Sequence, residues 1–199
     1  MDQQSALEEI ALIKRVIEES REFTFNIGKN ITIWGILISI AIFGSYGAIV
    51  NGYTRLSIWI WAVTIGGGWI FSIISGIREK SKTRNYGVKT ISFVWTSCGI
   101  AMTILGFAGT ISGGIEDWAV APVIATIMGT GFAGTAFVQE LRWVMYVAVA
   151  WWLGALFMFF IKGYETLLIF GAMMILFEVL PGIIFHSQWK NKQQNAEAK

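Results

Sequence analysis

The stretch "ITIWGILISIAIFGSYGAIV" at residues 31–50 contains no charged residue. A helix that crosses the hydrocarbon core of a bilayer needs about 20 mostly apolar residues. This stretch therefore predicts a transmembrane helix, and five further apolar windows of similar length follow it along the chain. The predicted spans cover residues 31–50, 57–77, 90–112, 118–138, 143–161 and 164–185.

The composition agrees with a chain that lies mostly in lipid. Hydrophobic residues make up 55% of the 199 residues, charged residues 14%, and the mean hydropathy is +0.60. Soluble domains carry about 25% charged residues, so this chain has too little polar surface to face water. Its 22 Gly and 10 Trp fit the same class, because Gly is favoured at membrane helix contacts and Trp at membrane interfaces. We expect an all-α, polytopic membrane helix bundle of six transmembrane helices.

Charge and cysteine usage exclude several other classes. A net charge of +2 gives no reason to expect a nucleic-acid partner. Cys98 and His186 are the single cysteine and the single histidine, so the chain cannot form an internal disulfide or a Cys/His metal cluster. We therefore expect neither a metal site nor a cofactor.

The basic residues predict the orientation of the spans. Of the 15 Lys and Arg residues, only Arg55 and Lys162 fall on one side of the predicted membrane, and all the others fall on the opposite side. The positive-inside rule places the basic side in the cytoplasm. Both termini are thus expected to be cytoplasmic, in a multi-pass protein of the cell inner (plasma) membrane.

The segment before the first span predicts a cytoplasmic amphipathic helix. Ser5 and Glu8 have the spacing of a capping box. One apolar stripe recurs at helical intervals and consists of Ala6, Ile10, Ile13 and Ile17. Because the segment is acidic, one interpretation is that it docks over the basic loop 78–89 or pairs with a partner protein. The alternative is an ordinary solvated helix. The predicted domains are residues 1–29 for this helix and its linker, 30–186 for the bundle, and 187–199 for a cytoplasmic polar tail.

Glu178 is the one carboxylate well inside a predicted span. Pro181 cannot donate a backbone hydrogen bond to the carbonyl of Phe177, so a kink is expected there. Intramembrane acids usually face the bundle interior and have a partner. Two interpretations stay open: a proton- or ion-coupling site, or a structural hydrogen bond or ion pair, most simply with Arg142. The full candidate polar site comprises Glu178, Arg142, Glu140, Gln139 and His186.

Small residues predict close helix contacts. The row Gly68, Ser72 and Gly76 in the second span follows a small-xxx-small pattern, although adjacent glycines could also mark an unwound transporter helix. The string "GFAGT" occurs twice, and supplies Gly106 and Gly109 in the third span and Gly131 and Thr135 in the fourth. The two copies lie at different depths and outside any three-plus-three repeat, so we interpret both as packing surfaces.

The charged "EEIALIKRVIEESRE" segment, followed by "GKNITIWGILI" at the start of six short-looped spans, resembles small uncharacterised bacterial six-span membrane proteins with an N-terminal cytoplasmic amphipathic helix. The resemblance covers mainly the first 40 residues and the hydropathy profile. It implies a bacterial inner membrane and no catalytic residues.

Three functional classes follow from these patterns. The first is a non-enzymatic protein with an accessory, regulatory or scaffolding role, with a protein partner or a homo-oligomer formed through its glycine faces. The second is a small transporter or channel that uses Glu178 as a coupling or pore-lining carboxylate, together with the hydroxyl side chains of Thr96, Ser97, Thr126 and Thr130. The third is an intramembrane enzyme, which is disfavoured because the sequence offers no paired acids and no nucleophile with a base.

Overall fold

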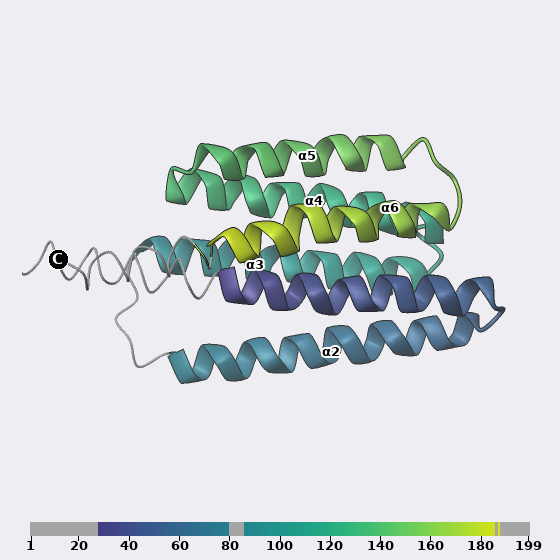
Figure 1. Cartoon of the computed structure of the whole chain (residues 1–199). Coiled ribbons are helices and arrows are strands. Elements are labelled where there is room, and N and C mark those ends of the chain that lie inside the picture. Colours follow the sequence, from purple (N-terminus) through teal and green to yellow (C-terminus); the bar gives the residue numbers. More distant parts are fainter. Residues whose placement is uncertain (1–27, 80–85, 186, 188–199) are drawn as a thin grey trace, which may run out of the picture.

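The computed structural model describes residues 28–79, 86–185 and 187, and the regular elements in this part of the chain are all helices. Figure 1 shows them side by side along a common direction. The predicted amphipathic helix, His186 and almost all of the predicted polar tail lie outside the described residues. In chain order the elements are the helix Gly28–Val50, α2 (Thr54–Glu79), α3 (Tyr86–Thr103), the π-helix η1 (Ile104–Gly109), α4 (Asp117–Gln139), α5 (Arg142–Met158), α6 (Glu165–Met174) and the π-helix η2 (Ile175–Val179).

Five helices are long and apolar enough to cross a membrane, which indicates a membrane protein. α6 and η2 belong to one continuous helix, Glu165–Phe185, which we call the last helix. α5 is apolar but shorter, with 17 residues. The predicted windows agree with the helix bounds to within four residues at each end, because hydropathy directly reports the length of chain that lies in lipid.

The helices are buried to very different extents. In the apolar stretch of α4, 50% of the residues are buried, against 11% in α2 and in α3. α4 packs on α3, α5 and α6. Figure 1 shows α2 at one edge of the bundle, beside the helix Gly28–Val50. The core centres on Phe132 of α4 and Trp151 of α5, whose rings stack with centroids 6.5 Å apart.

Consecutive helices are joined by three contacts of one kind, which we call the tryptophan contacts. In each, an indole ring covers a glycine of the next helix and its N–H donates to the Ser or Thr hydroxyl four residues further on. The pairs are Trp34 with Gly68 and Ser72, Trp69 with Gly99 and Thr103, and Trp95 with Gly131 and Thr135. The donor–acceptor distances are 3.1, 3.2 and 2.9 Å, respectively.

Glycine and hydroxyl have separate tasks in these contacts. A side chain at the glycine would occupy the place of the ring, and the indole N–H needs an acceptor because lipid offers none. The acceptor hydroxyl of Thr103 itself donates to the carbonyl of Gly99 at 2.7 Å, and that of Thr135 to the carbonyl of Gly131 at 2.9 Å. In these two contacts the chain of hydrogen bonds thus ends on a backbone carbonyl.

The predicted small-residue row of α2 is only partly a helix contact. Trp34 packs over Gly68 and donates to Ser72, so the row receives an indole ring rather than a second backbone. Gly76 lies in α2, and its surroundings are outside the described part of the structure. Gly66 and Gly67 have no atom within 4 Å of an added Cβ, and the α-helix runs through the whole "GGG" sequence without unwinding.

The two "GFAGT" strings differ in structure. The copy in α4 packs against α3 through Gly131 and Thr135. The first copy falls largely in η1, where an added Cβ on Gly106 would meet nothing within 4 Å and one on Gly109 would meet Ile115 of the following loop. At the first copy the two glycines therefore meet no neighbouring helix, although η1 as a whole contacts α4.

Candidate functional site

Glu178 lies in η2, the π-helical part of the last helix. The backbone N–H of Leu180 donates to the carbonyl of Ile175, five residues earlier, so the regular α-helical pattern is interrupted just before Pro181. A proline without an N–H disturbs the hydrogen bonds of the preceding turn. The expected kink thus takes the form of a π-helical segment, a feature that is frequent at functional sites.

Trp151 compensates for the hydrogen bond that Pro181 cannot make. Its Nε1–H donates to the carbonyl oxygen of Phe177 at 3.2 Å, the group that a non-proline residue at position 181 would have bonded. The Trp151 ring is fully buried and also packs edge-on against Phe170 and Phe177. Since an unpaired carbonyl is costly in lipid, this bond fixes the last helix to α5 next to Glu178.

The helix Gly28–Val50 passes directly over Glu178. A Cβ on Gly35 would lie 2.8 Å from Cγ2 of Val179 and 3.2 Å from Cγ of Glu178. One turn further along, a Cβ on Gly182 would lie 2.9 Å from the backbone N of Thr32. Glycine at both positions allows the two backbones to approach closely, and it brings the first described helix against the glutamate.

The side chain of Glu178 is buried. The residue is 4% exposed, and its Oε2 is buried with no hydrogen-bond partner among the described residues. Arg142 is exposed at the beginning of α5, and the adjacent Trp143 packs on Phe185, two turns beyond Glu178 and roughly 10 Å along the helix. The predicted ion pair between Glu178 and Arg142 is therefore not formed, because the two residues lie at different levels of the bundle.

The other residues of the predicted polar site form the turn between α4 and α5. Glu140 is exposed and adopts a left-handed backbone conformation with φ of 55°, and its N–H caps the end of α4. The amide of Gln139 is buried, and neither its nitrogen nor its oxygen has a partner in the described residues. The predicted five-residue cluster therefore does not assemble. Glu178 stands apart from the turn that contains Gln139, Glu140 and Arg142, and His186 is not described.

The hydroxyl side chains expected to line a transport path lie on the outside of the bundle. Thr96, Ser97, Thr126 and Thr130 are exposed. Three of them donate back to their own helices, Thr96 to Ser92, Thr126 to Pro122 and Thr130 to Thr126. A Ser or Thr with this bond has no unmet hydrogen-bond donor, so it is tolerated on a lipid-facing surface.

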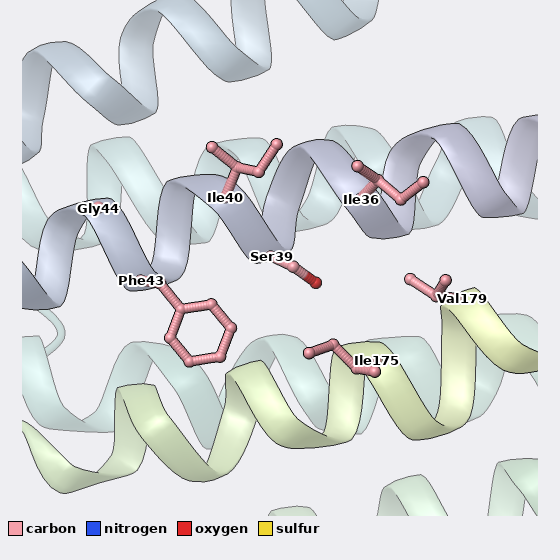
Figure 2. Close-up of a pocket in the computed structure, with 7 residues that line it drawn as sticks. All are labelled: Ile36, Ser39, Ile40, Phe43, Gly44, Ile175 and Val179. Atoms are coloured by element: carbon pink, nitrogen blue, oxygen red, sulfur yellow. The ribbon is translucent and has the colours of Figure 1, made fainter.

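A groove runs along the contact between the helix Gly28–Val50 and the last helix. It has a volume of about 540 Å³ and is lined by Ile36, Ser39, Ile40, Phe43, Gly44, Ile175 and Val179. Figure 2 shows Ser39 and Phe43 pointing towards the last helix and Val179 pointing back. The Ser39 hydroxyl donates to the carbonyl of Gly35 at 2.7 Å, so the groove offers no free donor. Glu178 is adjacent to Val179 in sequence but is not among the lining residues.

Sequence reasoning missed most of the residues around Glu178 and at the helix contacts. Trp34, Trp69 and Trp95 were not singled out, although each faces a Gly-xxx-Ser or Gly-xxx-Thr sequence on the next helix. Gly35 and Gly182 were also missed. Gly35 and Ser39 are four residues apart, a small-xxx-small spacing that could have pointed to this helix contact.

Within residues 28–79, 86–185 and 187, no three His, Cys, Asp or Glu side chains lie close enough together to hold a metal ion. No protein-family model, curated protein or solved structure gives a significant match to this chain.

Proposed function

We propose that this chain is an integral membrane protein with a non-enzymatic accessory, regulatory or scaffolding role, which acts through a protein partner or a second copy of itself. It crosses the inner (plasma) membrane six times with both termini in the cytoplasm. In addition to the five long helices, α5 is counted as a span. Its 17 residues extend roughly 25 Å as a helix, at the short end of the range that spans a bilayer, and it packs closely against α4.

One observation carries the choice of function: the polar groups that a transport path would need do not converge. The hydroxyls of Thr96, Thr126 and Thr130 face outwards and bond to their own helices, while Glu178 is sealed between helices. A pathway for a polar solute requires such groups to line a continuous water-filled cavity. Their separation supports a role in which the bundle positions other proteins.

A small transporter or channel remains the second candidate, and one observation favours it. Glu178 is a carboxyl group inside a span with an oxygen that has no partner among the described residues, and such groups frequently mark proton or ion pathways.

Two experiments separate these functions. The first is affinity purification from the native membrane, in which we expect a stoichiometric membrane-protein partner or a homo-oligomer. The second is a flux assay for protons and monovalent ions in proteoliposomes, in which we expect no difference between wild type and Glu178→Gln. A monomer without a partner, together with flux that Glu178→Gln abolishes, would replace the accessory role by transport.

A further inference from the structure

Glu178 sits where three structural features meet. It lies within η2, its side chain contacts the helix Gly28–Val50 at Gly35, and the neighbouring carbonyl of Phe177 is held by Trp151. Its Oε2 has no hydrogen-bond partner among the described residues. Among the described residues, the other buried side-chain polar atoms without a partner are Ser45 Oγ and the amide of Gln139, so Glu178 has the one ionisable group of this kind.

Among the described residues, no charged group pairs with Oε2 of Glu178. The elements that pack against the last helix are the helix Gly28–Val50, α4 and α5. The described ionisable side chains of these elements and of the turns at their ends are exposed or half-buried, and none of them bonds to Oε2 of Glu178: Lys29, Tyr46, Tyr53, Glu116, Asp117, Glu140, Arg142, Tyr146, Lys162, Tyr164 and Glu165. A carboxylate charge without a partner is strongly disfavoured in a membrane interior, whereas the uncharged acid is not.

We propose that the carboxyl group of Glu178 is a proton-binding site, and that loss of its proton loosens the crossing of the helix Gly28–Val50 over the last helix. The bound proton completes the O–H bond of the neutral acid in the closed arrangement. On release it passes to water, which reaches the carboxylate when the crossing opens. This goes beyond the proposed accessory role, because it assigns a ligand and a moving contact to a particular residue.

The helix Gly28–Val50 is the element expected to move. It covers Glu178 at Gly35, where only glycine fits. The groove beside this crossing leaves room on the flank formed by Ile36, Ile40 and Val179, as Figure 2 shows. On the other side of Glu178, the bond from Trp151 to Phe177 holds the last helix to α5. A shift of the helix Gly28–Val50 near Gly35 thus exposes the carboxyl group while the bond between Trp151 and Phe177 stays formed.

Proton binding by Glu178 is tested on the wild-type protein with dicyclohexylcarbodiimide, a reagent that reacts with the neutral form of a carboxylic acid in apolar surroundings. We expect one adduct on Glu178, located by peptide mass mapping, whose yield falls as the pH is raised. Glu165→Gln is the matched control on the same helix and should leave the adduct unchanged, while Glu178→Gln should abolish it. The absence of an adduct at Glu178, or a yield that does not change with pH, would overturn the proposal.

The moving contact is tested with a single cysteine in the crossing. Cys98→Ala removes the only native thiol, and Ser39→Cys places a thiol of nearly the same size beside Gly35. We expect the rate of the maleimide reaction at position 39 to rise with pH, and this rise to be roughly tenfold larger in the protein with Glu178 than in the Glu178→Gln protein. The Glu178→Gln background corrects for ionisation of the thiol itself. Equal pH dependence in the two backgrounds would show that the carboxyl group does not control the crossing. If Glu178→Gln fails to fold, the carbodiimide reaction of the wild type still decides whether the proton is bound.

Discussion

Trp95 and Thr135 form the shortest of the three tryptophan contacts, with 2.9 Å between Nε1 and Oγ1. Thr135 is fully buried and its hydroxyl also donates to Gly131, so the indole, the hydroxyl and the carbonyl make one chain. Interhelical hydrogen bonds of this kind contribute about 0.6 kcal/mol on average in membrane proteins and up to about 1.7 kcal/mol.

A double-mutant cycle measures this contact. We expect Trp95→Phe and Thr135→Val to be coupled by about 0.6–1.7 kcal/mol in the free energy of unfolding, because either change alone removes the same bond. The measurement is unfolding in mixed detergent micelles. Thr130→Val is the control, since Thr130 is exposed and bonds only to its own helix, and it should be additive with Trp95→Phe. Coupling of zero for the Thr135 pair would mean that the bond does not form in the membrane.

The three adjacent glycines of α2 offer a second test at the scale of single residues. A Cβ on Gly68 would lie within 2.8 Å of three atoms of the Trp34 ring, whereas a Cβ on Gly66 or Gly67 would meet nothing within 4 Å. We expect Gly68→Ala to lower the free energy of unfolding by about 1–3 kcal/mol through overpacking. Gly67→Ala should leave it unchanged or raise it by up to about 1 kcal/mol, through the higher helix propensity of alanine. Equal effects at the two positions would contradict the placement of Trp34.

The sequence predicted several contact positions but not the residues that occupy the other side of each contact. The small-xxx-small pattern identified Gly68, Ser72, Gly131 and Thr135 as contact positions without saying what contacts them. The identity of the partner ring depends on how each helix is rotated about its axis, which hydropathy does not encode. Tryptophan is usually expected at membrane interfaces, so Trp34, Trp69 and Trp95 gave no signal of their roles between helices.

At the scale of one element, the last helix joins a π-helical segment, a proline and an indole bond. The sequence predicted that Pro181 leaves the Phe177 carbonyl without its usual donor. It did not predict the donor, Trp151, because the two residues are 26 positions apart and meet only when α5 packs on the last helix. The distortion therefore appears as η2 rather than as a simple bend.

A cycle between α5 and the last helix tests this element. In the wild type, Trp151→Phe should leave the Phe177 carbonyl unpaired, but in a Pro181→Ala background the new backbone N–H at position 181 can replace the indole. We therefore expect Trp151→Phe to cost about 1 kcal/mol less in the Pro181→Ala protein, as measured by unfolding in detergent micelles. Pro122→Ala, at the only other proline, is the control and should not alter the cost of Trp151→Phe. An equal cost in all three backgrounds would show that the indole bond is not a replacement for the missing backbone bond.

For the whole molecule, the number and approximate bounds of the apolar helices follow from hydropathy and length alone. Their arrangement does not. Hydropathy does not distinguish the six helices by burial. In the structure, half of the apolar stretch of α4 is buried, whereas most of α2 and α3 is not. The sequence placed Glu178 and Arg142 in the same half of the membrane, which is why they were expected to pair. In the structure, α5 packs on the last helix in a register that separates the two residues along the helix axis.

Whether α5 crosses the membrane determines the number of spans and the direction in which the last helix crosses. The decisive measurement is labelling of single cysteines by a membrane-impermeant maleimide in a Cys98→Ala background, before and after cells are permeabilised. Cysteines at Asn51 and Gly163 should react in intact cells, and a cysteine at Glu140 only after permeabilisation. Reaction of positions 140 and 163 from the same side would show that α5 does not cross the membrane, and would contradict the six-span bundle with both termini in the cytoplasm.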